Sequence, residues 1–232
     1  MKKNLAVFAM IAAITMFAAG AMAWEQGNKY MRSIKGNYYI VGSGACLLAP
    51  GGFDEETLQP ITGVSGPWAL SNATWEGVYS FKHDGTGTFK AIYRVVDKPS
   101  QNWPPAPPGQ PQPTDGDIPD VGAADITWNF HYTLSQTGRI TFMFDKGTYE
   151  GNWTYGLQKN TSLYLDVSGP YYGVLSPDHQ NILVTWGVPL QLLVTLDKDN
   201  EIPLFPVICN VVQQGFRCNN CPELVYTPKP EQ

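Results

Sequence analysis

The sequence predicts an all-β fold, most simply an antiparallel up-and-down β-barrel, from three observations. Short stretches of alternating apolar and polar residues recur along the 232-residue chain, and this period of two is typical of strands with one buried face. Turns containing glycine or proline separate the stretches, and no long amphipathic helical pattern is present. Each stretch has one aromatic-rich face. Closure would bury these faces and remove exposed strand edges, so a barrel is favoured over the alternative, a β-sandwich.

Residues 1–23 have the pattern of a secretory signal peptide. Two lysines precede an apolar run from Leu5 to Ala18, and Ala21-Met22-Ala23 is a small-x-small cleavage motif. The apolar run is short for a membrane-spanning helix, so we expect a mature chain that starts at Trp24. No later segment is apolar over enough residues to span a bilayer as a helix. The pattern therefore predicts export to the periplasm or the outside of a bacterial cell.

The remaining residues, 24–232, are expected to form a single domain, because all-β domains of roughly 200–250 residues often fold as one unit. The formal net charge of the chain is −5, and cleavage of the leader would remove two more positive charges. An acidic chain without a basic cluster argues against nucleic acid and anionic membrane surfaces as partners.

The first hairpin is expected within residues 74–97, after an initial strand over residues 33–46. Its apolar side chains occupy odd positions from Trp75 to Phe81 and from Phe89 to Val95. A two-residue Asp84-Gly85 turn would mix the two faces, so the hairpin needs an odd loop or one extra residue, which Gly87 can supply as a bulge. With that bulge the expected cross-strand pairs are Phe81–Phe89, Tyr79–Ala91 and Glu76–Arg94.

The segment from Lys98 to Asp120 is proline-dense and is expected to leave the sheet as a long excursion. One interpretation is a docking surface from Pro99 to Pro119, partly in polyproline II conformation and helped by Trp103, for a protein partner. The other interpretation is a solvated loop without a partner.

The second hairpin is predicted over residues 126–144, with a three-residue loop that places Gly138 in the left-handed conformation. It pairs Leu134 with Ile140, Tyr132 with Phe142 and Phe130 with Phe144. Further strands are expected at residues 148–155, 161–167, 171–175, 182–186, 190–196 and 202–211, followed by a tail over residues 212–232.

Four cysteines in an exported chain predict disulfides. Cys46 ends the first expected strand and Cys209 lies in the last, and these strands are neighbours in a closed barrel, so Cys46–Cys209 is the favoured pair. Cys218 and Cys221 form a CxxC in the expected tail, for which a local disulfide, a redox site and half of a zinc site are the alternatives. The local disulfide is preferred, because no βαβ context and no second CxxC are present.

The aromatic faces are the main candidate for a functional site. A barrel of about eight strands either fills its interior with side chains or holds one small ligand. A packed core and an apolar ligand cavity are therefore the two interpretations. The candidate cavity residues are Trp75, Tyr79, Phe81, Trp128, Phe130, Tyr132, Phe142 and Trp153.

The sequence contains no catalytic motif, so no catalytic residue, metal or cofactor is expected. The histidines His83, His131 and His179 lack the spacing of metal ligands, and no nucleophile motif such as GxSxG is present. The leading hypothesis is non-enzymatic binding of a small apolar or aromatic ligand in the interior. A structural or interaction module of the cell envelope that uses the proline-rich segment is second. A cyclase- or isomerase-like barrel enzyme, which would need a buried carboxylate or histidine, is third.

Two resemblances accompany these motifs. The chain contains IKGNYYIVGSGACLLAPGGF, WEGVYSFKHDGTGTF and a late PVIC, and in these strings it resembles a group of uncharacterised exported bacterial β proteins. That resemblance supports the Cys46–Cys209 bridge and implies no activity. Gly36-Asn37-Tyr38-Tyr39 resembles the Gly-x-Trp signature of lipocalins and the wider calycin barrels, with Tyr38 where tryptophan is expected. The other lipocalin signatures are missing, so this second resemblance implies the fold alone.

Overall fold

Eleven β-strands form one antiparallel sheet in the computed structural model of the chain. The structure describes residues 34–49, 52–54, 56–61, 69–99, 120–156, 162–167, 170–185, 190–195 and 205–224. Within these ranges no helix is long and apolar enough to cross a bilayer. The strands are β1 (Gly36–Leu48), β2 (Ala69–Phe81), β3 (Thr86–Pro99), β4 (Asp120–Leu134), β5 (Arg139–Phe144), β6 (Glu150–Tyr155), β7 (Ser162–Val167), β8 (Tyr171–Leu175), β9 (Asn181–Thr185), β10 (Leu190–Thr195) and β11 (Phe205–Cys218).

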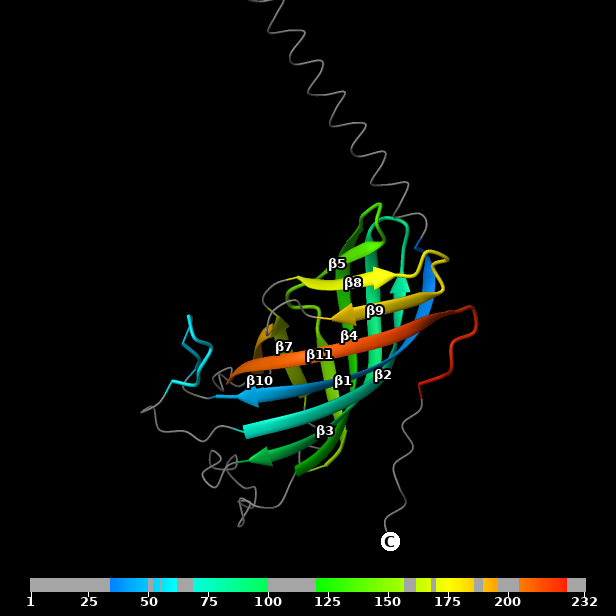
Figure 1. The fold of residues 1–232 in the computed structure, drawn as a ribbon. Coiled ribbons are helices and arrows are strands. Elements are labelled where there is room, and N and C mark those ends of the chain that lie inside the picture. Colours follow the sequence, from blue (N-terminus) through cyan, green and yellow to red (C-terminus); the bar gives the residue numbers. More distant parts are fainter. Residues whose placement is uncertain are drawn as a thin grey trace, which may run out of the picture.

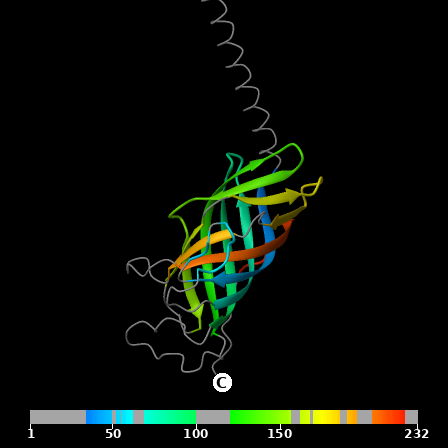
Figure 2. The same cartoon turned by 60° about the vertical axis from the view of Figure 1, so that its left-hand side comes forward.

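The sheet closes on itself into an up-and-down barrel, which confirms the predicted fold class and excludes the sandwich. The first strand β1 pairs along its length with β2 on one side and with the last strand β11 on the other. Figure 2 shows this seam, with β1 in blue beside β11 in orange. Closure leaves the long strands β1 and β2 without a free edge, as expected for a barrel.

Eleven strands form an 8-strand barrel because three positions in the wall are each shared by two short strands that lie end to end. One edge of β4 pairs with β5 through Phe130–Leu134 and with β6 through Ala123–Thr127. One edge of β11 likewise pairs with β9 and, nearer its start, with β10. Figure 1 shows β5, β8 and β9 in the upper part of the barrel and β7 and β10 beneath them. One side of the wall is thus continuous and the other is interrupted half-way.

The first hairpin has a different register from the predicted one. Phe81 lies opposite Gly87, Tyr79 opposite Phe89 and Trp75 opposite Tyr93. Gly85 has a φ of 84°, and the amide of Lys82 donates to the carbonyl of Thr86, so an odd three-residue loop connects the strands. This loop keeps the odd-numbered apolar side chains of both strands on the same face. The predicted bulge at Gly87 is therefore wrong. Glu76 and Arg94 still form an ion pair at 2.7 Å, but across the diagonal.

The second hairpin confirms the prediction in each pair. Leu134 lies opposite Ile140, Tyr132 opposite Phe142 and Phe130 opposite Phe144. Gly138, at the third loop position, has a φ of 79°, which a glycine adopts without steric cost.

Two predicted boundaries need correction. β3 extends to Pro99 and β4 begins at Asp120, so the excursion predicted from Lys98 to Asp120 is shortened to residues 100–119, which lie outside the described part. Pro99 ends its strand opposite Ala69, where the missing N–H of proline is tolerated. β11 continues to Cys218, so residues 212–218, predicted as tail, complete the barrel wall opposite β1.

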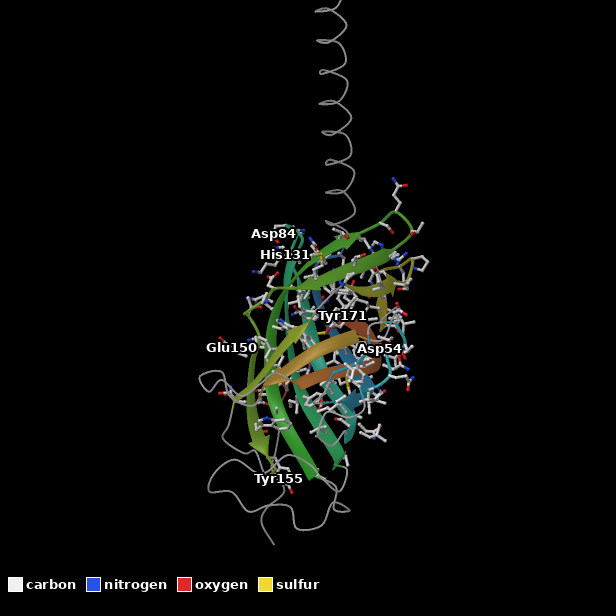
Figure 3. The ribbon with its side chains drawn as sticks, turned by 90° about the vertical axis from the view of Figure 1, so that its left-hand side faces the viewer. Asp54, Asp84, His131, Glu150, Tyr155 and Tyr171 are labelled. Carbon is white, nitrogen blue, oxygen red and sulfur yellow. A yellow bond between two sulfur atoms is a disulfide. The ribbon has the colours of Figure 1, made fainter. Side chains whose placement is uncertain are left out.

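The two ends of the barrel have different connections. At one end, here called the turn end, the connections are short and span residues 82–85, 135–138 and 176–180. At the other end, the loop end, β1 leads into residues 49–68, β3 into 100–119 and β10 into 196–204. Figure 3 shows Asp84 and His131 at the turn end and Tyr155 at the loop end. The side chains that line the interior also differ between the turn end and the loop end.

Candidate ligand site

The interior of the barrel contains all eight of the predicted cavity residues. Alternation places these side chains on the inner face of β2, β4, β5 and β6, and each is at least nine-tenths buried. All eight belong to one continuous core cluster. Five of them lie in the turn-end half, and the tryptophans Trp75, Trp128 and Trp153 lie nearer the middle and the loop end.

The turn-end cluster consists of Tyr79, Phe81, Phe130, Tyr132 and Phe142. The ring of Tyr79 lies 5.6 Å from that of Phe130 and 5.5 Å from that of Phe142, and Phe81 meets Tyr132 edge to face at 5.0 Å. Such spacings are typical of close-packed aromatic side chains. These five residues therefore pack closely together as the turn-end part of the core.

The buried tyrosine hydroxyls of this half have hydrogen-bond acceptors within the protein. Tyr79 donates to the side-chain oxygen of Gln213 at 2.7 Å, and Tyr38 donates to the carbonyl of His179 at 2.8 Å. Tyr132 donates to the carbonyl of Lys82 at 2.5 Å. Burial raises the pKa of Tyr132 to about 12 and raises the pKa of Tyr79 further. These hydroxyls stay protonated at neutral pH and act as structural donors.

The loop-end half is organised around a second group, the aromatic belt of Trp75, Tyr93 and Trp153. Trp75 and Tyr93 lie directly opposite each other on β2 and β3, and their rings stack at 6.3 Å and 25°. The ring of Trp153 on β6 approaches Tyr93 at 6.4 Å and 68°. Tyr93 was not among the predicted cavity residues, although its odd position in the first hairpin already placed it on the inner face.

Two glycines allow the belt tryptophans to lie against the barrel wall. A Cβ on Gly42 would come within 2.4 Å of the Trp75 indole, and a Cβ on Gly122 would come within 2.6 Å of the Trp153 ring. Only glycine accommodates so close an approach. Ala73 and Ala124 are further inward-facing neighbours of the belt with small side chains. The turn-end half has the same kind of contact, because a Cβ on Gly87 would come within 2.3 Å of the Phe130 ring.

Three indole N–H groups in this interior lack an acceptor. The Nε1 atoms of Trp75, Trp128 and Trp153 are buried and have no hydrogen-bond partner, and the exposed fractions of the residues are 9%, 6% and 9%. Trp128 borders the turn-end core, because its ring lies 4.0 Å from that of Phe144, which in turn contacts Phe130 at 5.9 Å. On its other side it meets the ring of Tyr149 edge to face at 5.0 Å. Buried donors in folded proteins are nearly always paired, so these three call for an explanation.

No ionised side chain is buried in the described part of the interior. Apart from the aromatic residues, the buried polar side chains there are those of Ser71 and Gln213. Figure 3 shows Tyr171 near the middle of the barrel, and burial raises its pKa well above the usual value. Within the described ranges no group of three His, Cys, Asp or Glu residues is arranged to hold a metal ion.

The histidines lie away from the interior. His83 is in the exposed turn between β2 and β3, and the carbonyl of His179 accepts the Tyr38 hydroxyl at the turn end. His131 is on the outer face of β4, with its Nδ1 atom 2.5 Å from the carboxylate of Asp145. None of these side chains is placed to act on a molecule inside the barrel.

Both predicted disulfides are present. Cys46 and Cys209 lie directly opposite each other on β1 and β11 and are bonded, as are Cys218 and Cys221 just beyond the turn end. Disulfides of this kind are typical of proteins in an oxidising compartment. The predicted signal peptide, residues 1–23, and the proline-rich residues 100–119 lie outside the described part of the chain.

Comparison with protein-family models, with curated proteins and with solved structures found no match to this chain. The function must therefore be inferred from the geometry of the interior.

Proposed function

We propose that this protein is an exported, non-enzymatic container that binds one small apolar or aromatic molecule in the loop-end half of its barrel. The carrying observation is the set of buried indole N–H groups without a partner. The tyrosine hydroxyls of the turn-end half have acceptors within the protein, whereas the Nε1 atoms of Trp75 and Trp153 toward the loop end have none. Apolar walls with a few fixed polar groups are characteristic of small-molecule sites.

Two further observations support a binding role over a catalytic one. The described interior holds no carboxylate or histidine, and its tyrosines stay protonated at neutral pH, so it offers no general base. Strands β1, β3 and β10 end at the loop end, beside the proposed site, whereas short turns and the aromatic core close the turn end. The two disulfides fit a protein that works outside the reducing cytoplasm.

The test is a titration with N-phenyl-1-naphthylamine, a neutral aromatic probe that fluoresces strongly in apolar surroundings. We expect a saturable increase in fluorescence with one probe per chain. The matched variants are Ala73→Phe, on the inner face of β2 beside Gly44, and Ala45→Phe, on the outer face of the neighbouring strand. The inner substitution should abolish binding without unfolding the protein, and the outer substitution should leave binding unchanged.

The same pair of variants can overturn the proposal. If the interior around Ala73 is close-packed, Ala73→Phe overpacks it and lowers the free energy of unfolding by about 1–3 kcal/mol or more. Strong destabilisation of this variant, together with no probe binding by the unmodified protein, would identify the loop-end half as a second packed core. The container function would then be wrong.

A further inference from the structure

We infer that the ligand of the loop-end half is a neutral, flat molecule whose carbonyl oxygen accepts a hydrogen bond from at least one of the indole N–H groups of Trp75, Trp128 and Trp153. The inference rests on the proposed function, because it names the class of molecule that the same interior would bind. Three features carry it: the unpaired donors, the lack of buried charge and the flat aromatic walls.

The unpaired donors determine the polarity of the ligand. An indole nitrogen can only donate, so a ligand that satisfies these groups must supply acceptors. The hydroxyls of Tyr38, Tyr79 and Tyr132 at the turn end all have acceptors within the protein. Among the described residues, the three indoles are the exceptions, although an unpaired buried donor costs more than a typical hydrogen bond contributes. We assign the acceptor of at least one of them to the ligand.

The absence of buried charge indicates that the ligand is neutral. Ser71 and Gln213 are the buried polar side chains of the described interior apart from its aromatic residues, so neither an anion nor a cation would find a counter-charge. Transfer of an unpaired charge into such surroundings is strongly unfavourable. A cation would in addition meet the positive ends of the N–H dipoles.

The aromatic belt indicates that the ligand is flat. Trp75 and Tyr93 present nearly parallel ring planes at 25°, and Trp153 closes the next side with a ring at 68° to Tyr93. A planar conjugated molecule can stack on the first surface and meet the second edge to face, which are the favoured aromatic geometries. A conjugated ketone or quinone combines this shape with carbonyl acceptors.

The first experiment compares 2-acetylnaphthalene with 2-isopropenylnaphthalene, a hydrocarbon of nearly the same shape in which a methylene group replaces the carbonyl oxygen. Displacement of N-phenyl-1-naphthylamine gives both affinities. We expect the ketone to bind about three- to tenfold more tightly, the ratio that one or two neutral hydrogen bonds supply. In each of the variants Trp75→Phe, Trp128→Phe and Trp153→Phe, the hydrocarbon is the internal control. The variant that lacks the indole N–H bound by the ketone should bind the ketone no more tightly than the hydrocarbon. Its affinity for the hydrocarbon should equal that of the unmodified protein.

A second measurement does not depend on whether the variants fold. In the unmodified, nitrogen-15-labelled protein, the ketone should move at least one indole N–H proton resonance of Trp75, Trp128 or Trp153 downfield, and the hydrocarbon should not. Equal affinities for both probes without such a shift would overturn the inference and leave the container function in place. Failure of both probes and of N-phenyl-1-naphthylamine to bind would overturn the container function itself.

Discussion

At the scale of single residues, Glu76 joins three neighbouring strands on the outer face of the barrel. Its carboxylate accepts a hydrogen bond from the Tyr39 hydroxyl at 2.7 Å and pairs with the Arg94 guanidinium at 2.7 Å. The hydrogen bond from Tyr39, followed by that from Arg94, lowers the pKa of Glu76, and the same hydrogen bond raises the pKa of Tyr39 to about 12. Glu76 therefore contributes stability in its ionised form.

The prediction concerns Glu76→Gln. Because the pKa of Glu76 is lower in the folded than in the unfolded chain, its contribution is fully present above the unfolded value of about 4.3 and is lost as the pH falls through the folded value. We expect Glu76→Gln to lower the free energy of unfolding at pH 7 by about 0.5–1 kcal/mol, the range of partly exposed ion pairs. Urea unfolding at pH 7 and pH 3 measures the difference. An equal loss at both values would show that the effect comes from packing rather than from charge.

The inner face of the barrel could be predicted residue by residue, but the roles of its aromatic side chains could not. Alternation alone identified Trp75, Tyr79 and Phe81 as inward-facing, and all are buried. Whether an inward ring spans the interior or lies against the wall depends on its neighbour across the sheet. Trp75 lies on Gly42 and Trp153 on Gly122. These glycines belong to strands whose register the sequence did not establish.

At the scale of elements, two glycines with the same backbone conformation separate backbone strain from crowding. Gly138 has a φ of 79° and Gly147 a φ of 77°. A Cβ on Gly138 would lie 3.1 Å from the Leu175 carbonyl oxygen, whereas a Cβ on Gly147 would meet nothing within 4 Å. We expect Gly147→Ala to lower the free energy of unfolding by about 1 kcal/mol, the steric cost of the left-handed conformation. Gly138→Ala should cost more, and urea unfolding of both variants measures the difference. A smaller loss at Gly138 than at Gly147 would mean that strand β8 shifts freely to accommodate the methyl group.

Loop length explains which hairpin register could be predicted. In the second hairpin, a three-residue loop and the parity of its apolar residues agree, so one register satisfies both. In the first hairpin, either an odd loop or a bulge would keep the apolar side chains of both strands on one face. The structure has the odd loop, with Gly85 in the left-handed conformation. The end-to-end arrangement of β5 and β6 was also missed. Where the ladder between β4 and this edge is interrupted, the hydroxyl of Thr148 accepts a hydrogen bond from the Asn129 amide.

At the scale of the whole molecule, the Cys46–Cys209 disulfide fastens the seam at which the barrel closes. It joins the first strand to the last across a sequence separation of 163. In the chain-entropy account, a cross-link stabilises by restricting the unfolded chain, and the effect grows with the length of the loop. The Cys218–Cys221 disulfide, with a sequence separation of 3, is the natural control.

We expect replacement of both Cys46 and Cys209 by alanine to lower the free energy of unfolding by up to about 5 kcal/mol, and replacement of Cys218 and Cys221 to lower it by about 2 kcal/mol or less. Because Cys209 faces the interior of the loop-end half, the first variant should also weaken probe binding, whereas the second should bind as the unmodified protein does. Urea unfolding and fluorescence titration of both double variants measure these effects. If the two variants lose equal stability, the ladder between β1 and β11 holds the seam by itself, and the disulfide is not what keeps the barrel closed.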